Sequence, residues 1–390
     1  MRIAFIGQKG IPSKFGGVEK HVEDLSVRLA VAGHEVIVYT RPNYTDPGLT
    51  EWRGVKLVSL PSIGTKHLDA ISHTLRVCLD VARREVDIVH FHSIGPSSLI
   101  WLVKLLKPNT PVISTFHAQC YKHQKWGSFA KLYLKYGEMV CCTLADRTLT
   151  VSRHLKRYAE KKYRRSIDYV PNGVEPQAEK DADQIAQWGL AKNNYIVAVS
   201  RLVKHKGLHY LIKAFGGIKT EKKLVIVGGG AFTDKYVNEF QALADADSRI
   251  VVTGVRNGET LAQLFANAYL FVQPSESEGL SISLLEAMAY GRACLVSDIP
   301  ENLEAAGANA ISFKNKSIRD LREQLELLLD DQERVEENGR LNRERVREQY
   351  NWDQIATEVE QIYQQVSEEY KEKKRFARLR LAGKMIGILF

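Results

Sequence analysis

The sequence lacks a hydrophobic run long enough to cross a bilayer. Its longest apolar stretch, around residues 99–106, is interrupted by Lys104 and falls well short of the roughly 20 residues that a spanning helix needs. The first seven residues run straight into a strand and a glycine turn, without the longer apolar core of a secretory signal. We therefore expect a cytoplasmic protein.

Cysteine is scarce as well. The five cysteines are odd in number and show no C-x-x-C spacing, which argues against a disulfide framework and against a structural zinc site. Two D-x-D triplets, at residues 181–183 and 245–247, lie in a polar stretch and in a predicted surface helix or turn. We expect neither triplet to bind a metal ion.

The first strand-to-helix connection also lacks the G-x-G-x-x-G spacing of a dinucleotide fingerprint. It contains Gly7 and Gly10, followed by the pair Gly16 and Gly17. Paired glycines before a helix let the backbone approach a phosphate or a sugar closely. A flexible loop that simply precedes a helix would look the same.

Short apolar runs alternate with amphipathic helical stretches along nearly all of the 390 residues. This alternation predicts an α/β protein with parallel sheets covered on both faces. The expected strands are residues 3–6, 36–40, 87–92, 111–116, 167–170, 195–200, 223–227, 249–253, 270–273 and 293–297.

The turn-rich segment 171–176, Pro-Asn-Gly-Val-Glu-Pro, marks the best domain boundary because the alternation starts again after it. We expect two doubly wound domains that face each other across a cleft, with ligands at the carboxyl ends of their strands. The expected division is residues 1–170, residues 171–350, a helix over 351–370 that packs back toward the N-terminal domain, and a basic amphipathic tail over 371–390.

Charge is distributed unevenly. Residues 1–172 contain 26 Lys and Arg against 14 Asp and Glu, residues 173–370 contain 22 against 31, and the last 20 residues contain 7 against 1. Three clusters within the basic parts, at residues 121–136, 156–165 and 375–390, mix cations with aromatic or apolar residues. Any one of them could be a solvated helix, but together they favour an anionic membrane surface as a partner.

The segment 278–286, Glu-Gly-Leu-Ser-Ile-Ser-Leu-Leu-Glu, is the most informative in the chain. A glycine-led turn opens a helix between two carboxylates eight positions apart. Helix N-terminal amides suit a phosphate, and carboxylates suit the hydroxyl pairs of sugars. A sugar nucleotide carries all of these groups.

Three further residues follow predicted strands. Arg201 and Lys206 flank the start of a helix, where two cations could stabilise a departing diphosphate or could be ordinary surface charges. His117 follows the strand 111–116, and this position distinguishes it from His90, His92 and His123 as a group that could hydrogen-bond a substrate hydroxyl.

With these motifs in order, the whole chain resembles the retaining glycosyltransferases of family 4, which have the GT-B architecture of two Rossmann-like domains. Glu278 and Glu286 match the family's E-x7-E motif. The resemblance implies that Glu278 contacts the donor sugar, that Glu286 holds the ribose, and that Gly279, Leu280 and Ser281 present amides to sugar and phosphate. Ser281 departs from the glycine or proline of many members.

The resemblance also assigns the diphosphate to Arg201 and Lys206, an active-site role to His117, the N-terminal glycine loop to Gly16 and Gly17, and the base to the region ending at Arg256. It implies metal-independent transfer, with retention, from a UDP-, GDP- or dTDP-sugar to a hydroxyl of a lipid-linked or cell-surface glycan, as in capsule, exopolysaccharide or cell-wall assembly. The enzyme would be peripheral on the inner face of the membrane.

Two other functions remain open from the sequence. A sugar-nucleotide epimerase or hydrolase could use the same fold without an acceptor. Nucleic-acid binding would fit the isoelectric point near 9.1, but the basic half has no recognition module, and we do not expect a nucleic-acid partner.

Overall fold

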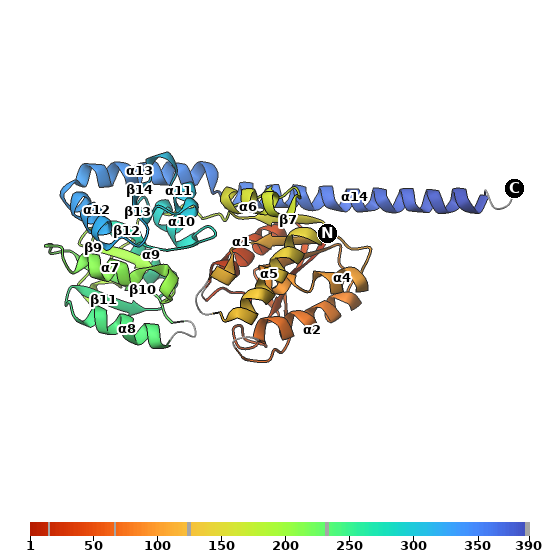
Figure 1. The fold of residues 1–390 in the computed structure, drawn as a ribbon, viewed down its shortest axis with the longest axis horizontal. Coiled ribbons are helices and arrows are strands. Elements are labelled where there is room, and N and C mark those ends of the chain that lie inside the picture. The colour runs from red at the N-terminus through yellow and green to blue at the C-terminus, as the bar shows by residue number, and fades with distance from the viewer. Residues whose placement is uncertain (15, 66–67, 123–125, 231–233, 387–390) are drawn as a thin grey trace.

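Two α/β units, each built around its own sheet, make up the computed structural model (Figure 1). The structure describes residues 1–14, 16–65, 68–122, 126–230 and 234–386, and for residues 375–386 it describes the backbone alone. His123, Lys125 and residues 387–390 of the predicted tail lie outside the described residues.

The N-terminal sheet has eight strands in the order β3-β4-β2-β1-β5-β6-β7-β8, and all neighbours are parallel except β3 and β4. Its strands are β1 (Arg2–Ile6), β2 (Glu35–Thr40), β3 (Glu51–Trp52), β4 (Val55–Ser59), β5 (Ile88–His92), β6 (Val112–Phe116), β7 (Arg147–Thr150) and β8 (Asp168–Tyr169). The helices of this unit are α1 (Gly17–Val31), α2 (Asp69–Arg83), α3 (Ile94–Ser97), α4 (Ile100–Leu106), α5 (Ser128–Thr143) and α6 (Arg153–Tyr163), with a 3-10 turn, η1 (Cys120–Lys122).

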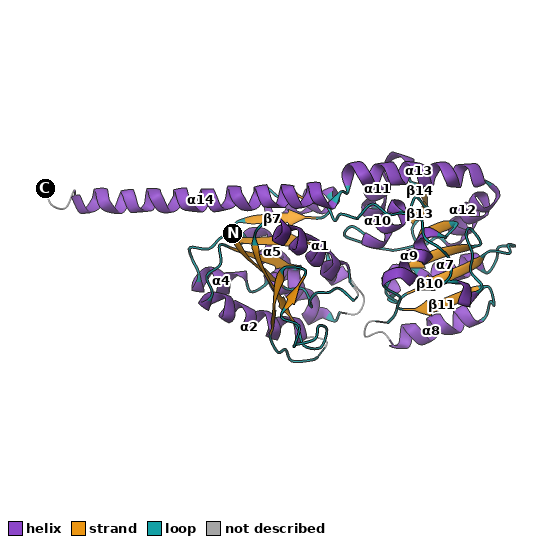
Figure 2. Ribbon diagram, turned by 180° about the vertical axis from the view of Figure 1, so that it is seen from behind, coloured by secondary structure: helices purple, strands orange, loops and turns teal. Residues whose placement is uncertain are grey.

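The C-terminal sheet has six parallel strands in the order β11-β10-β9-β12-β13-β14. They are β9 (Tyr195–Val199), β10 (Lys223–Val227), β11 (Ile250–Gly254), β12 (Leu270–Gln273), β13 (Ala293–Ser297) and β14 (Ile311–Phe313). The helices are α7 (Leu208–Phe215), α8 (Asp234–Asp245), α9 (Gly258–Ala266), α10 (Ile282–Ala289), α11 (Pro300–Ala306), α12 (Ile318–Asp330) and α13 (Gln332–Gln349), with 3-10 turns η2 (Ala186–Trp188), η3 (Lys204–Lys206) and η4 (Gly307–Asn309). Figure 2 shows helices on both faces of each sheet.

The predicted strands are all present, each within one residue of its expected bounds at either end. The central strands β1, β5, β6 and β12 are almost completely buried. Strands buried on both faces are nearly continuously apolar, so the sequence was sufficient to predict them. Four strands were not predicted from the sequence, namely β3, β4, β7 and β14. β7 reads Arg-Thr-Leu-Thr and β14 reads Ile-Ser-Phe, so neither shows an apolar run.

The last helix, α14 (Trp352–Ile386), packs on the N-terminal unit although it follows the C-terminal unit in sequence. Its buried residues Trp352, Val359 and Tyr363 join the core beneath β1 and α1. The helix begins at Asn351, whose Oδ1 accepts hydrogen bonds from the next two backbone amides. It continues without a break into the predicted tail and extends beyond the N-terminal unit (Figure 1). In the described part of the chain, neither α14 nor another helix has the length and apolarity needed to span a membrane.

The chain crosses between the units twice, and the two crossings lie side by side. The amide of Val174 donates to the carbonyl of Tyr350 at 2.8 Å, and Val174 forms a parallel bridge with Asn351. Gly173 packs against Trp352 so closely that an added Cβ would lie 2.6 Å from the indole ring. The connection between the units is therefore compact.

Candidate functional site

Most of the predicted site residues, with the exception of Arg256, lie where the carboxyl ends of the two sheets face each other. His117 follows β6 in the N-terminal unit, whereas residues 278–281 connect β12 to α10 in the C-terminal unit. A Cβ added to Gly279 would lie 1.8 Å from the carbonyl oxygen of His117. The loop 278–281, called the donor loop below after the role that the resemblance implies, therefore touches the other unit and leaves no room for a side chain at its glycine.

Lys206 and Glu278 form an ion pair within this region. The Lys206 Nζ lies 2.5 Å from the Glu278 Oε1, and the two side chains are only 13% and 10% exposed. Gly207, with φ of +69°, packs so tightly that a Cβ would be 1.9 Å from the carbonyl oxygen of Pro274. This packing of η3 on the end of β12 brings Lys206 to the donor loop. Because an ammonium has three N–H donors, Lys206 can bind further oxygen atoms while it holds Glu278.

Arg201 contributes a second cation, and Lys9 of the N-terminal unit a third. Burial lowers the pKa of the Lys9 ammonium, Glu19 opposes this effect, and Arg201 and Arg41 add to the lowering. Cations from both units thus share one environment, which suits a diphosphate better than separate surface charges would. Lys9 is not among the residues predicted from the sequence, although its place after β1, between Gly7 and Gly10, was a usable signal.

Ser281 holds the donor loop in place. Its Oγ accepts the Leu284 amide as the N-cap of α10 and donates to the Gln273 Oε1 at 2.7 Å. The Gln273 Nε2 in turn donates to the Asn302 Oδ1 at 2.7 Å, and all three side chains are buried. The serine that departs from the family pattern therefore caps the helix and orients its first turn.

The glycine pair at the start of α1 lies opposite the first turn of α10. Gly16 has φ of +110°, a backbone conformation that favours glycine. A Cβ on Gly17 would lie 3.7 Å from the Ile282 Cδ1. The glycine loop therefore contacts the donor helix, in agreement with the close approach that paired glycines permit.

Glu286, one turn farther along α10, faces α1 of the other unit. Burial raises the pKa of its carboxyl to about 7, Lys20 opposes the shift, and Asp24 adds to it. Lys20 is itself paired with Asp24, with 2.9 Å between Nζ and Oδ1. The Lys20 ammonium is thus shared with Asp24, and burial prevails at Glu286, whose carboxyl can exchange its proton near neutral pH.

His117 belongs to a buried group of four histidines. Its Nε2 lies 3.1 Å from the Nδ1 of His92, and the rings of His21 and His90 pack against the same group. Burial, reinforced by the neighbouring histidines, lowers the pKa of His117 well below its ordinary value. The imidazole is therefore neutral at physiological pH and suited to hydrogen bonding rather than to supplying a proton.

His21 also links the units through a residue of the connecting segment. Its Nδ1 lies 2.9 Å from the Asn172 Oδ1, and the Asn172 Nδ2 donates to the Leu280 carbonyl at 2.8 Å. Asn172 thereby joins α1, the connection between the units and the donor loop. Neither His21 nor Asn172 is among the residues predicted from the sequence, because each contact spans more than one hundred residues of sequence.

Within the described residues, one group of side chains has the spacing to hold a metal ion, namely His21, His92 and His117 with nitrogen atoms within 4.8 Å of one another. Two of these nitrogens already bond to each other, and His21 bonds to Asn172. In the D-x-D triplets, Asp183 accepts a hydrogen bond from Gln263, and Asp247 pairs with Arg249 at 2.7 Å.

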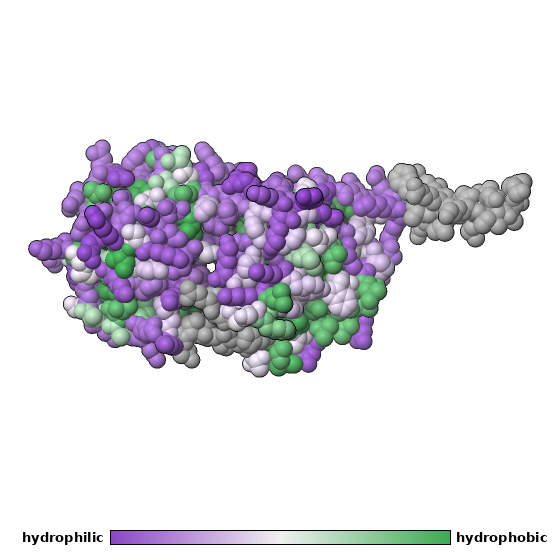
Figure 3. Space-filling view, in the orientation of Figure 1, coloured by the Kyte–Doolittle hydropathy of each residue, from purple (hydrophilic) through white to green (hydrophobic). Residues whose placement is uncertain are grey.

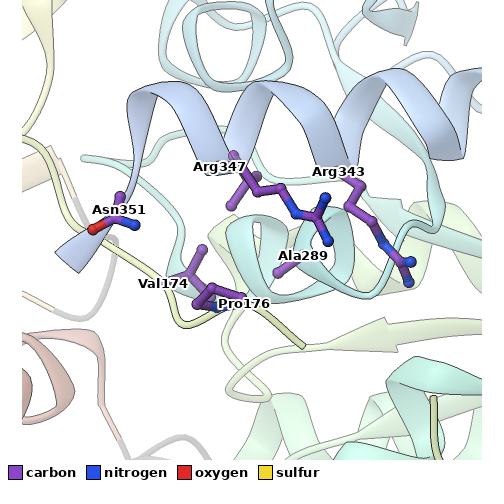
Figure 4. Close-up of a pocket in the computed structure, with 7 residues that line it drawn as sticks. Val174, Pro176, Ala289, Arg343, Arg347 and Asn351 are labelled. Carbon is purple, nitrogen blue, oxygen red and sulfur yellow. The ribbon is translucent and has the colours of Figure 1, made fainter. Parts of the chain in front are cut away.

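Arg256 contacts none of the other predicted donor-binding residues in the interactions found among the described residues. It is exposed, and its guanidinium lies over the indole of Trp188, 5.1 Å from the ring centroid. The hollow shown in Figure 4 is also separate, because Ala289 at the far end of α10 and Arg343 of α13 line it together with Val174. None of the predicted site residues lines this hollow.

Residues 15–178 match the family description "Glycosyltransferase Family 4", and residues 180–345 match "Glycosyl transferases group 1". Glycogen synthase of Mycobacterium tuberculosis is 26% identical over 93% of this chain and 94% of its own. The UDP-Gal:alpha-D-GlcNAc-diphosphoundecaprenol alpha-1,3-galactosyltransferase of Escherichia coli is 26% identical over 56% of this chain and 60% of its own.

Two solved structures share the fold. Sucrose-phosphate synthase from Thermosynechococcus elongatus has a TM-score of 0.79 at 22% identity and covers 94% of this chain and 98% of its own. Anabaena HepE in complex with UDP-glucose has a TM-score of 0.77 at 17% identity and covers 95% and 100%.

Gly279→Ala should separate the two units without unfolding either one. The new Cβ collides with the His117 carbonyl, a contact that exists only when the units meet, so we expect a larger radius of gyration in solution scattering. Gly127→Ala is the control, since nothing lies within 4 Å of a Cβ there. Scattering by Gly279→Ala that matches that of the parent protein would refute the contact.

Glu286→Gln should change how stability depends on pH. Burial raises the pKa of the folded carboxyl from its ordinary value of 4.5 to about 7, so the stabilisation by its protonated form is complete below pH 4.5 and is lost as the pH rises through 7. In urea unfolding, the stability of the parent protein relative to the variant should be about 1–3 kcal/mol greater at pH 4.5 than at pH 8. The exposed Glu326→Gln should show no such difference, and an equal response in both variants would contradict the assignment.

Proposed function

Since the chain belongs to the family 4-type glycosyltransferases and has the GT-B fold, we propose that it transfers a sugar, with retention, from a nucleoside-diphosphate sugar to a hydroxyl of a lipid-linked or cell-surface glycan. The observation that carries this proposal is the Lys206–Glu278 ion pair in the contact region between the two units. A cation for the leaving group and a carboxylate for sugar hydroxyls are both found there.

The charges of the site support a leaving diphosphate. As the bond between the anomeric carbon and the phosphate oxygen breaks, its electron pair passes to that oxygen, and negative charge grows on the diphosphate. Lys206, Arg201 and the first amides of α10 stabilise this charge without an added metal ion. The same cations attract the intact donor less strongly, so they lower the barrier as well as bind the substrate.

Retention follows when the acceptor hydroxyl attacks from the face that the diphosphate leaves. The acceptor oxygen forms the new bond to the anomeric carbon, and its proton passes to the departing phosphate oxygen. A neutral His117 hydrogen-bonds a sugar hydroxyl and orients the donor, in keeping with its lowered pKa. Glu278 serves to hold the sugar, because its ion pair with Lys206 makes the carboxylate a weaker nucleophile.

Glu286 and the glycine loop complete the donor site. Glu286 would accept hydrogen bonds from the ribose diol, and Gly16 and Gly17 would let the backbone of the N-terminal unit approach the sugar and the phosphates. UDP is one donor nucleotide to test, because HepE was solved with UDP-glucose. GDP- and dTDP-sugars remain in the same proposal.

A lipid-linked acceptor is favoured by charge and by one relative. Residues 1–172 have an excess of 12 positive charges, and the Escherichia coli relative carries a diphosphoundecaprenol acceptor in its name. The protein would then act from the cytoplasm, peripheral on the inner face of the membrane. A soluble glucan acceptor is the second candidate, favoured by the similarity to glycogen synthase over most of the chain.

Lys206→Ala should reduce the turnover of glycosyl transfer by about 10²–10³-fold, as for loss of a group that stabilises transition-state charge. Lys204→Ala is the matched control, because Lys204 lies in the same 3-10 turn and is exposed. EDTA should leave the turnover of the parent protein unchanged. A loss of activity in EDTA that Mg²⁺ or Zn²⁺ restores would contradict the metal-independent mechanism.

Incubation with the donor alone should give little turnover, whereas adding a polyprenyl-diphosphate sugar should give an α-linked product from an α-linked donor. Domain contact excludes water from the donor, which limits hydrolysis. The measurement is NMR of the anomeric proton of the product, with donors of the three bases in parallel. Fast turnover without any acceptor would instead identify a hydrolase or an epimerase, and transfer only to a soluble glucan would identify the second candidate.

A further inference from the structure

Exposed apolar side chains are concentrated on one side of the N-terminal unit. Figure 3 shows green atoms where Figure 1 places α2, α4 and α5. We call this surface the apolar face and define it by Leu75 and Leu79 of α2, Trp101 and Leu105 of α4, and Phe129 and Leu132 of α5, all of which are exposed.

The three helices form one continuous surface, since α4 contacts both α2 and α5. On α5 the exposed apolar residues Phe129, Leu132, Tyr136 and Met139 recur every three or four positions and therefore follow one stripe of the helix. The opposite stripe of α5 is buried in the core. Helix α5 is therefore apolar on two sides, of which the protein covers only one.

The degree of exposure distinguishes this surface from ordinary scattered leucines. Phe129 is 85% exposed, Leu105 70% and Leu132 68%. The C-terminal unit, as far as it is described, shows exposed large apolar residues only at Val255, Leu303 and Leu327. A contiguous exposed apolar surface marks a site of interaction with a partner or a membrane.

The positive charge near the apolar face indicates which kind of partner it binds. Between Asp87 and Glu138 the sequence has six lysines and no Asp or Glu, and this stretch contains α4 and most of α5. Glu138 itself is buried and bonded to Lys162, Tyr158 and Tyr163. A second copy of the chain would bring the same lysines together and repel, whereas anionic lipid headgroups would pair with them above an apolar interior.

Helix α14 adds to the positive charge at the edge of this surface. The hydroxyl of Tyr370 lies 3.5 Å from the Nζ of Lys104 on α4. Beyond that contact the chain carries seven Lys and Arg against one Glu in its last 20 residues. The backbone of α14 continues as a helix to residue 386, so this charge starts directly beside α4.

We propose that the apolar face docks on an anionic lipid bilayer, with Phe129, Leu132 and Leu105 inserted among the acyl chains and the lysines of α5, Lys131 and Lys135, at the headgroups; Lys104 of α4 is already paired with Asp146 at 2.8 Å. The docking also explains how a lipid-linked acceptor reaches the site, a step that rests on the proposed function. His117 follows β6 directly and α5 begins eleven residues later, so the helix start that carries Phe129 lies toward the sheet edge that carries His117. The acceptor can stay in the bilayer while its sugar enters the site.

Cosedimentation with vesicles tests the docking directly. The variant Phe129→Ser with Leu132→Ser removes apolar surface that the fold does not use, and Leu303→Ser with Leu327→Ser is the control on the other unit. On vesicles of phosphatidylglycerol mixed with phosphatidylcholine, we expect the first variant to bind at least about tenfold more weakly than the parent protein and the control to bind equally. Vesicles of phosphatidylcholine alone should bind the parent protein weakly.

Equal binding by the first variant and the parent protein, or no binding by the parent protein, would overturn the proposal. A parent dimer in sedimentation that this variant converts to a monomer would overturn it too, because a second copy would then cover the face. Nucleotide-induced thermal stabilisation should be the same in all three proteins and shows that the donor site is intact. If vesicle binding follows the expectation while no acceptor is glycosylated, the proposed function fails and the docking surface stands.

Discussion

The close approach of Gly279 to the His117 carbonyl is the contact on which the rest of the site depends. It fixes the donor loop against the end of β6, so that groups from both sheets surround one region. A carbonyl and a Cα that meet without a side chain between them can do so only at glycine. The same approach places the first turn of α10 against the glycine loop and Glu286 against α1. Each of these contacts would be lost if the two units moved apart.

The charges around the contact region favour the binding of an anion. Burial and the nearby Arg201 destabilise the charged form of Lys9 and lower its pKa. An anion in the region would therefore relieve the repulsion between cations of different units. The buried histidines remain neutral and add no charge of their own. In the proposed reaction, a diphosphate that gains charge would therefore meet its strongest stabilisation at the moment of bond breaking. Asn172 connects this region to the segment between the units, which gives the fold a direct means of coupling closure to the donor loop.

The sequence was sufficient for the parts of the fold that show strong periodicity. Apolar runs such as residues 223–227 became buried central strands, and the segment 278–286 became a donor loop and a helix as expected. β7 and β14 were missed because alternating or very short strands have no such run. Lys206 was placed beside Glu278 only by the structure, since the tight packing of Gly207 on Pro274 cannot be read from spacing. His21 and Asn172 were missed for the same reason, because their contacts join segments that are distant in sequence.

In the proposed reaction the diphosphate of the donor binds between the two units, at Lys206 of η3 and at Arg201, which follows β9. A crystal structure with a nucleoside diphosphate measures this directly. We expect phosphate oxygens within hydrogen-bond distance of Arg201 and of the Lys206 Nζ, beside the first turn of α10. A diphosphate bound away from both cations, with the Lys206–Glu278 pair untouched, would contradict it.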